Sequence, residues 1–386
     1  MNNNPARKLV IILLMLVVLA TNDCAASPQP QVQARLEGLA VAPGNFNRAD
    51  GARALVFPHD LGPHPDFQTE WWYYTGNLAA PDGQRFGFQL TFFRRALLGP
   101  ADRARRRSTW GTDQVYLAHF ALTDAASGQF HAFERFERGA AGLAGAQADP
   151  HYRVWLQDWW VEQVGPAAYK LQAAQEGIKL QLDLKDGKGI VLQGDQGYSQ
   201  KGPGIGNASY YTSQTRLESS GSIEVNGKSF KVSGLSWMDH EFSTSALSPD
   251  QVGWDWFSIQ LDDGSELMVY QIRKKDGSVD PFSSGTIIYA DGGRRALKAG
   301  DFSIQVDSTW KSPHSTGVYP AAWTISVPSE GLTLHIKPIL ADQELNVSFI
   351  YWEGAVQVEG EKNGVKMNAK GYVELTGYAQ SLAGRF

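Results

Sequence analysis

Short runs in which apolar and polar residues alternate recur along the whole chain and predict β-strands. A period of two places every second side chain on the same face of an extended strand. Gly, Asn or Asp bounds most of these runs, as antiparallel strands joined by tight turns require. In chain order the runs are FGFQLTFF (86–93), VYLAHFALTD (115–124), IKLQLDL (178–184), SIEVNG (222–227), KSFKVSG (228–234), WFSIQL (256–261), ELMVYQI (266–272), DFSIQV (301–306) and WTISV (323–327). Two less regular stretches, Leu98–Gly111 and Arg138–Pro150, are expected to be loops.

Two hairpin patterns each occur twice, in the same order. An aromatic hairpin begins at Trp71 (WWYYTGNLAAPDGQRFGFQLTFFR) and again at Trp254 (WDWFSIQLDDGSELMVYQIR). A Gly-bounded hairpin follows at Gly221–Leu235 and again at Gly354–Tyr372. This duplication predicts two all-β domains, each with about eight strands, which is enough to close an antiparallel barrel and to hide its edges. Alternation alone leaves a pair of β-sandwiches as the alternative. The two expected domains are 27–247 and 248–386.

Residues 1–26 have the layout of a secretory signal. Two basic residues precede the apolar run Leu9–Ala20, and Cys24-Ala25-Ala26 forms a small-residue cleavage site. The run is too short to cross about 30 Å of hydrocarbon as a membrane helix. We therefore expect cleavage and a periplasmic or secreted mature chain. A lipoprotein is the alternative, although Asp23 stands where a small residue would have to precede Cys24.

Composition narrows the expected partners. Aromatic residues make up 11% of the chain, enough to fill β-sheet cores or to line an apolar pocket. The net charge is −5, so no nucleic-acid partner is expected. Cys24 is the only cysteine, and signal cleavage would leave no disulfide. The basic run RARRRS (103–108) is expected to be a solvated loop, with contact to anionic lipid head groups as its alternative.

Glu70 opens the segment EWWYYTG, in which both faces of the expected strand carry aromatic side chains. A carboxyl group in such a place is expected to be buried, and burial raises its pKa unless an arginine pairs with it. Arg94 or Arg95, at the end of the same hairpin, is the candidate for that pairing, which would make Glu70 structural. His59 and His64 lie in the loop FPHDLGPHPDF, which leads into Glu70, and are therefore candidates for an acid–base site.

Asp239, His240 and Glu241 stand side by side in the run LSWMDHEFS, between the last hairpin of the first copy and the first hairpin of the second. A junction between domains is a common place for a ligand cleft. If the strand continues through this run, Trp237, Asp239 and Glu241 face one way and His240 faces the other. His240 then needs a carboxylate from elsewhere, such as Glu70, or Asp239 acts alone. Either arrangement suits protonation of an alkene or activation of a water.

Other catalytic and metal-binding signatures are missing from the sequence. His119 lies in an alternating apolar run, where a histidine is more often a hydrogen-bonded core residue than a ligand or a base. No His-x-His, HExxH or cysteine spacing indicates a metal site, and neither a metal nor a cofactor is predicted. A Gly-x-Ser-x-Gly elbow, a P-loop and a GxGxxG turn are also absent, which leaves acyl-enzyme hydrolysis and nucleotide chemistry without support.

Several stretches of the chain resemble the carotenoid 1,2-hydratase (hydroxyneurosporene synthase) family, and especially its AttH-like branch of secreted bacterial proteins. They are, in order, FPHDLGPHPDFQTEWWYYTGNL, GFQLTFFRR, AHFALTD, YYTSQTRL, VSGLSWMDHEF and GWDWFSIQLDDGSELMVYQIR. The resemblance implies two tandem lipocalin-like barrels, an apolar pocket near their seam and, in the hydratases, cofactor-free addition of water to an isoprenoid double bond. It also implies proton transfer at His240. The chain departs from the hydratases at Tyr270-Gln271-Ile272-Arg273, where their acidic residue is missing.

Together these observations predict an exported protein that binds an apolar or amphipathic, lipid-like or isoprenoid-like ligand at the seam of two barrels. A hydratase-like or hydrolase-like acid–base activity is expected there, and a non-catalytic lipid or isoprenoid carrier that works with an envelope transporter is the alternative. The expected proton-transfer and supporting groups are Asp239, His240, Glu70 and His64. The expected ligand-binding residues are Trp71, Trp72, Tyr73, His119, Trp237, Trp254, Trp256 and Tyr270.

Overall fold

The computed structural model describes residues 46–103, 111–245 and 247–382, all within one compact unit. The expected signal segment 1–26 and the arginines of the basic run at 105–107 lie outside the described residues, so the expectations placed on them stay predictions. Among the residues described, no helix is long and apolar enough to cross a membrane.

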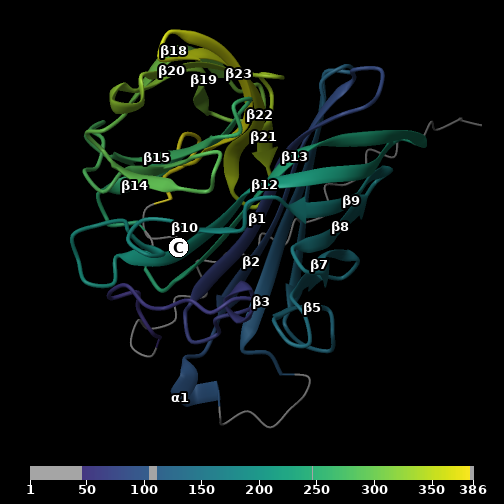
Figure 1. The fold of residues 1–386 in the computed structure, drawn as a ribbon. Helices are drawn as coiled ribbons and strands as arrows, with labels where there is room; N and C mark the ends of the chain where they lie inside the picture. The colour runs from purple at the N-terminus through teal and green to yellow at the C-terminus, as the bar shows by residue number, and fades with distance from the viewer. Residues whose placement is uncertain (1–45, 104–110, 246, 383–386) are drawn as a thin grey trace, which may run out of the picture. The chain divides into compact units, whose positions relative to one another are not determined.

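Two antiparallel β-sheets account for nearly all of the described secondary structure (Figure 1). The first sheet has 13 strands and closes nearly into a barrel, whereas the second has ten and forms a half-barrel. The predicted all-β, lipocalin-like class is confirmed. The first sheet contains β1 (Thr69–Ala79), β2 (Arg85–Ala96), β3 (Gln114–Asp124), β4 (Gln129–Arg138), β5 (Ala144–Gln147), β6 (Arg153–Leu156), β7 (Trp159–Gly165), β8 (Ala168–Gln175), β9 (Ile178–Asp186), β10 (Ile190–Leu192), β11 (Tyr198–Gln200), β12 (Ala208–Val225) and β13 (Lys228–Ser243). The second contains β14 (Gln251–Leu261), β15 (Glu266–Lys274), β16 (Ser284–Ile288), β17 (Arg294–Lys298), β18 (Ser303–Lys311), β19 (Val318–Val327), β20 (Leu332–Pro338), β21 (Glu344–Asn346), β22 (Ile350–Lys362) and β23 (Val365–Leu375).

The two sheets share one arrangement of strands, as the repeated hairpins predict. β1 lies between β2 and β13 in the first sheet, and β14 lies between β15 and β23 in the second. The β12–β13 hairpin turns at Asn226-Gly227 and the β22–β23 hairpin at Asn363-Gly364, and all four residues have positive φ. That conformation is typical of a type I′ hairpin turn. The chain passes between the sheets after β13, but whether each sheet folds as a separate domain stays a prediction.

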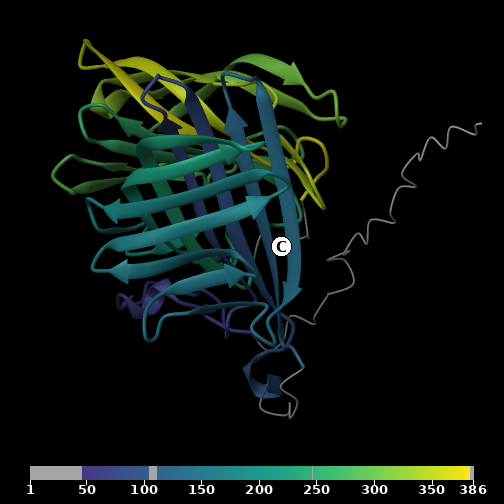
Figure 2. The ribbon, with the colours of Figure 1, turned by 90° about the vertical axis from the view of Figure 1, so that its right-hand side faces the viewer.

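Each sheet has an apolar core of its own. In the first sheet the long strands β1–β3 pack across the barrel interior against the short strands β6–β9, with Trp72, Phe120 and Trp159 fully buried. Figure 2 shows the short teal strands stacked one above another and crossing the direction of the long blue ones. The core of the second sheet is centred on Phe257, Trp323 and other buried side chains. Burial of each such side chain contributes about 1.5–3 kcal/mol, so the cores hold the strand faces in place.

One of the two expected loops contains a strand. Within Arg138–Pro150, residues Ala144–Gln147 form β5 and pair with β6. Ala and Gly have low β-propensity, so pairing with β6 and burial of Ala144, rather than the local sequence, explain the strand. The other expected loop, Leu98–Gly111, contains the short helix α1 (Pro100–Arg103), and its residues 104–110 lie outside the described part.

The two sheets face each other through a third apolar cluster. It contains Tyr73, Tyr211 and Trp237 from the first sheet and Trp256 and Tyr270 from the second. Hydrogen bonds also cross this contact. Tyr73 Oη donates to Glu353 Oε2 at 2.8 Å, and Trp256 Nε1 donates to Tyr211 Oη at 3.0 Å. The face formed by β1, β2, β12 and β13 is therefore covered by β14, β15, β22 and β23.

Candidate functional site between the two sheets

Alternation along β1 and β13 separates the candidate residues into two clusters. Glu70 and His240 point into the first barrel, where they meet. Trp71, Tyr73 and Asp239 point the other way and line a cavity against the second sheet. Asp239 and His240 face opposite sides of β13, as the alternation in the sequence predicts.

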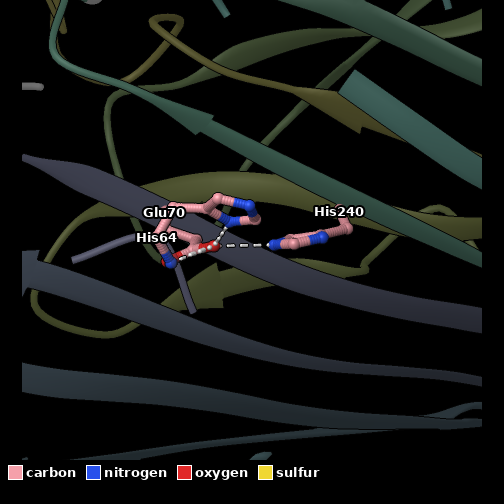
Figure 3. Close-up of side chains that lie close together, drawn as sticks. All are labelled: His64, Glu70 and His240. Carbon is pink, nitrogen blue, oxygen red and sulfur yellow. Dashed lines mark hydrogen bonds and ion pairs between the residues drawn. The ribbon is translucent and has the colours of Figure 1, made fainter. Parts of the chain in front are cut away.

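Glu70 is the centre of the cluster inside the first barrel (Figure 3). Its Oε1 accepts hydrogen bonds from His240 Nε2 and from His64 Nδ1, each at 2.8 Å. Its Oε2 accepts one from Arg94 Nε at 2.8 Å, so Arg94 rather than Arg95 is the paired arginine. His64 Nε2 lies 3.0 Å from Oδ1 of Asp60. All the side chains that meet here are buried.

Opposite charges are paired in this cluster, where Arg53 also contacts Asp60. Burial alone would raise the pKa of Glu70, but the Arg94 guanidinium and the His64 imidazole hold it well below its ordinary value. Burial would lower the pKa of His64, but the charge of Glu70 and the hydrogen bond to Asp60 raise it. The pKa of His240 is lowered, because burial outweighs its bond to Glu70. Both ring nitrogens of His64 face carboxylate oxygens, which favours its protonated form, whereas burial favours the neutral form of His240.

The ligand-type atoms of His64, Glu70 and His240 lie within 4.8 Å of one another, a spacing that a metal ion could bridge. The hydrogen bonds argue against a cation, because both Glu70 oxygens and both His64 ring nitrogens already have partners. A buried guanidinium beside Glu70 would also repel it. Arg94 Nη2 instead donates to the backbone carbonyls of His64 and Phe67 at 2.9 Å, which fastens the loop before β1 to the barrel.

A cavity of about 120 Å³ lies between the two sheets. One water needs roughly 10–15 Å³ of such space, so the cavity has room for a small ligand rather than a single water. Nine of the side chains in its wall are aromatic, and ten others carry hydroxyl, carboxyl or ammonium groups. The side chains that line it are Trp71, Tyr73, Thr91, Phe93, Lys201, Ser209, Tyr211, Asp239, Glu241, Ser243, Ser245, Leu247, Trp254, Trp256, Tyr270, Ile272, Phe349, Tyr351, Glu353, Glu374, Thr376 and Leu382.

Asp239 is the carboxyl group at the first-sheet wall of this cavity. Its Oδ2 accepts a hydrogen bond from Tyr211 Oη at 2.6 Å, and its Oδ1 accepts bonds from Ser213 Oγ at 2.5 Å and Trp237 Nε1 at 2.7 Å. Burial raises the pKa of Asp239 and these three donors lower it, with a net value of about 7. A group that titrates there can both donate and accept a proton near neutral pH.

Glu353 and Glu374 also line the cavity, and sequence reasoning missed both. They stand directly opposite each other on β22 and β23. Burial and the charge of Glu374 raise the pKa of Glu353 well above its ordinary value. Burial raises the pKa of Glu374 to about 8; a hydrogen bond from Trp254 opposes this shift, and the charge of Asp239 adds to it. The internal repeat held a usable signal, because Glu374 pairs with Trp256 as Asp239 pairs with Tyr73.

Five of the eight predicted ligand-binding residues line the cavity, namely Trp71, Tyr73, Trp254, Trp256 and Tyr270. Trp72 lies on the opposite face of β1 and stacks on the His240 ring, with centroids 5.0 Å apart. Trp237 lies behind Asp239 and donates to it. His119 is buried between Tyr351 and Glu134, with ring nitrogens 2.7 Å and 3.0 Å from their oxygens. These three side chains support the wall rather than form it.

Comparison with known proteins finds the model of a family described as AttH-like, which matches residues 48–378. A solved structure from Nitrosomonas europaea, described as an AttH, is 36% identical, covers 86% of this chain and 100% of its own, and has a TM-score of 0.77. Kievitone hydratase from Nectria haematococca is 12% identical over 87% of this chain and 96% of its own, with a TM-score of 0.65. CghA with bound Sch210972 is 12% identical over the same shares, with a TM-score of 0.52. The last two show a shared fold only. No curated protein matches.

Proposed function

The chain belongs to the AttH-like family, as its motifs predict, and on that premise we propose that it binds an apolar or amphipathic ligand between its two sheets and transfers a proton to it through Asp239. The observation that carries this proposal is the placement of Asp239 in an aromatic-walled cavity with a pKa of about 7. A structural neighbour that is named a hydratase supports a hydratase-like or hydrolase-like reaction class.

For a hydration, the step is balanced without a cofactor. Asp239 in its protonated form gives its proton to one carbon of a double bond, which leaves a cation on the other carbon. The faces of Trp71, Trp254 and Trp256 stabilise a cation. A water then adds to that carbon, and its proton returns to the carboxylate of Asp239. His240, Glu70 and His64 support this step from the other face by holding β1 and β13 in register.

Export is the second part of the proposal. The layout of residues 1–26 supports a periplasmic or secreted protein, in a compartment where membranes supply apolar molecules. The basic run at 103–108 is proposed as a contact to anionic lipid or to an envelope transporter.

A non-catalytic carrier of lipid or isoprenoid is the second candidate. It is favoured by the hydrogen bonds of Asp239, because three protein donors already satisfy the carboxylate, as in a purely structural carboxylate. In a carrier, the aromatic wall would serve for binding alone.

The test begins with mass spectrometry of small molecules extracted from the purified protein. Ser209→Phe, which fills the cavity wall, should remove the bound molecule, and Ser229→Phe at an exposed position should not. The identified molecule is then incubated with wild type and with Asp239→Asn. We expect a product one water heavier from wild type only, with Asp183→Asn, an exposed carboxyl on β9, as active as wild type. If the protein binds the ligand but neither wild type nor any variant converts it, the enzymatic proposal is wrong and the carrier function remains.

A further inference from the structure

Carboxyl groups outnumber cations in the cavity. Asp239, Glu241, Glu353 and Glu374 line it, and Lys201 is the only positively charged side chain among the described residues that do so. Glu241 is matched by Lys201, whose Nζ lies 3.5 Å from Oε1 of Glu241. The other three carboxyl groups have no cation in the cavity wall. A buried surplus of carboxyl groups is costly unless they stay protonated or meet a cation.

A comparison of the two repeated sheets shows that the second has one more carboxyl group at this place than the first. In the first sheet the strand neighbour of Asp239 on β12 is Ser213, which donates a hydrogen bond to it. In the second sheet the equivalent neighbour of Glu374 on β22 is Glu353, a second carboxyl group. Like charges directly opposite each other on neighbouring strands destabilise a sheet. The protein therefore keeps an arrangement here that packing alone does not explain.

One ammonium group, that of Lys201, already lies in this cavity, and its surroundings indicate how a second cation could be bound. Lys201 Nζ lies 4.0 Å from the ring centre of Tyr270 and 5.1 Å from that of Tyr211, with Glu241 as its carboxylate partner. Aromatic faces together with a carboxylate are the typical surroundings of a bound alkylammonium. Trp254 and Trp256 line the cavity beside Glu374, which lies opposite Trp256 on the neighbouring strand and accepts a hydrogen bond from Trp254. Aromatic side chains and carboxyl groups therefore also meet at this part of the cavity, where the described wall has no cation beside Glu353 or Glu374.

A second observation also points to a ligand. Ser209 lines the same cavity, is 2% exposed, and its Oγ has no hydrogen-bond partner among the described residues. A buried hydroxyl without a partner is rare in a native protein and calls for a bound group that satisfies it. Ser209 pairs with Ser199 on β11, two residues from Lys201, so its hydroxyl offers a polar contact in the part of the wall that also carries Lys201.

We propose that the cavity binds an amphipathic ligand with a cationic, alkylammonium-type group, which lies between Glu353, Glu374 and the neighbouring tryptophan rings. This inference rests on the ligand-binding part of the proposed function and names the class of its ligand. The apolar part of the ligand would lie along Phe93, Phe349 and Leu247.

Binding of a cation should be coupled to release of a proton. Burial raises the pKa of Glu374 to about 8 and that of Glu353 well above its ordinary value, which favours the protonated forms of the pair. The cationic group favours the ionised pair, and its affinity should rise as the pH rises from 6 to 9. The other charged or titratable groups that face the pair are Asp239, Glu241, Lys201, Tyr73, Tyr211, Tyr270 and Tyr351.

The test uses isothermal titration calorimetry with three probes of one chain length, namely octyltrimethylammonium, octyl glucoside and octyl sulfate, below their micelle concentrations. We expect the cationic probe to bind on the order of tenfold more tightly than the other two. Titrations in two buffers of different ionisation enthalpy should show proton release at pH 7. The double variant Glu353→Gln/Glu374→Gln should lose the preference, and Glu359→Gln, an exposed carboxyl on β22, should keep it.

Amides are isosteres of the carboxyl groups and can still accept the Tyr73 hydrogen bond, so the variants should fold, and their thermal unfolding is recorded alongside. Equal binding of the three probes to wild type would overturn the inference while the proposed pocket stands. A preference for the cationic probe that survives in the double variant would also overturn it. Absence of binding by all three probes, and of any extracted ligand, would overturn both.

Discussion

Asp239 and His240 are neighbours in the chain, yet their side chains leave β13 in opposite directions. The carboxyl group of Asp239 lies in the cavity between the sheets, where Tyr211 donates to it at 2.6 Å. The imidazole of His240 lies inside the first barrel, 2.8 Å from Glu70 and stacked on Trp72. The proposed proton transfer in this cavity therefore rests on Asp239, and the proposed part of His240 is to fix the strand that carries Asp239.

Replacement of His240 by Ala should lower stability. The change leaves Glu70 without one of its donors and opens a void beside Trp72, and we expect a loss of about 3 kcal/mol in the free energy of unfolding. Urea denaturation measures it. His335→Ala, at an exposed histidine on β20, serves as the control and should stay within about 0.5 kcal/mol of wild type. Unchanged stability of His240→Ala would show that His240 is not part of a structural network.

Glu70 and Arg94 should be strongly coupled. Either Glu70→Gln or Arg94→Met leaves a buried charge without its partner, and each should cost about 3–5 kcal/mol. The double variant should cost less than the two single losses together, because it removes both charges. Chemical denaturation of all four proteins gives the coupling energy. Additive losses would contradict the pairing.

The pKa of Asp239 predicts a pH dependence of stability that Asp239→Asn removes. The folded-state pKa is about 7 and the ordinary pKa of an aspartate is 3.8, so between these values the folded state binds more protons than the unfolded state. Stability therefore falls as the pH rises through this window, by at most about 1.4 kcal/mol per pH unit. Urea unfolding of wild type and Asp239→Asn from pH 4 to 8 measures the difference. A constant difference would contradict a raised pKa.

His64 should contribute less to stability as the pH rises. Its folded-state pKa is raised above 6.5 by Glu70 and Asp60, so its contribution is complete below pH 6.5 and disappears as the pH rises through the folded-state pKa. The stability of wild type relative to His64→Gln should therefore be larger at pH 6 than at pH 9. Arg94 and His240 also contact Glu70, the partner of His64. Neither changes the direction in which the contribution of His64 varies with pH. A relative stability that grows between pH 6 and pH 9 would contradict an imidazolium at His64.

The fold was predictable because its signals are local. A period of two marks most of the strands, and an Asn-Gly turn marks both copies of the Gly-bounded hairpin. The all-β class and the duplication can therefore be predicted from short stretches of the sequence. The strand β5 (Ala144–Gln147) carries no such signal, because its Ala and Gly residues have little β-propensity and its pairing with β6 forms it. The open second sheet was not predictable either, because closure depends on strand number and tilt across the whole sheet.

The candidate site was predictable only in part, for a similar reason. Alternation correctly separated Asp239 from His240, and the position of Glu70 in an aromatic strand indicated its burial. The pair Glu353 and Glu374 depends on register between β22 and β23, which no single run of residues reveals. Trp72 lies inside the barrel, as strand alternation requires. Its aromatic character alone wrongly predicts a place in the pocket wall.

The most direct measurement is the titration of the Asp239 carboxyl group by ¹³C nuclear magnetic resonance, with its signal assigned from the spectrum of Asp239→Asn. A proton-transfer group in the cavity should titrate with a midpoint near pH 7. An ordinary exposed aspartate should titrate near pH 4 in the same spectra. A midpoint for Asp239 near pH 4 would mean a permanently ionised, structural carboxylate and would contradict its role in proton transfer.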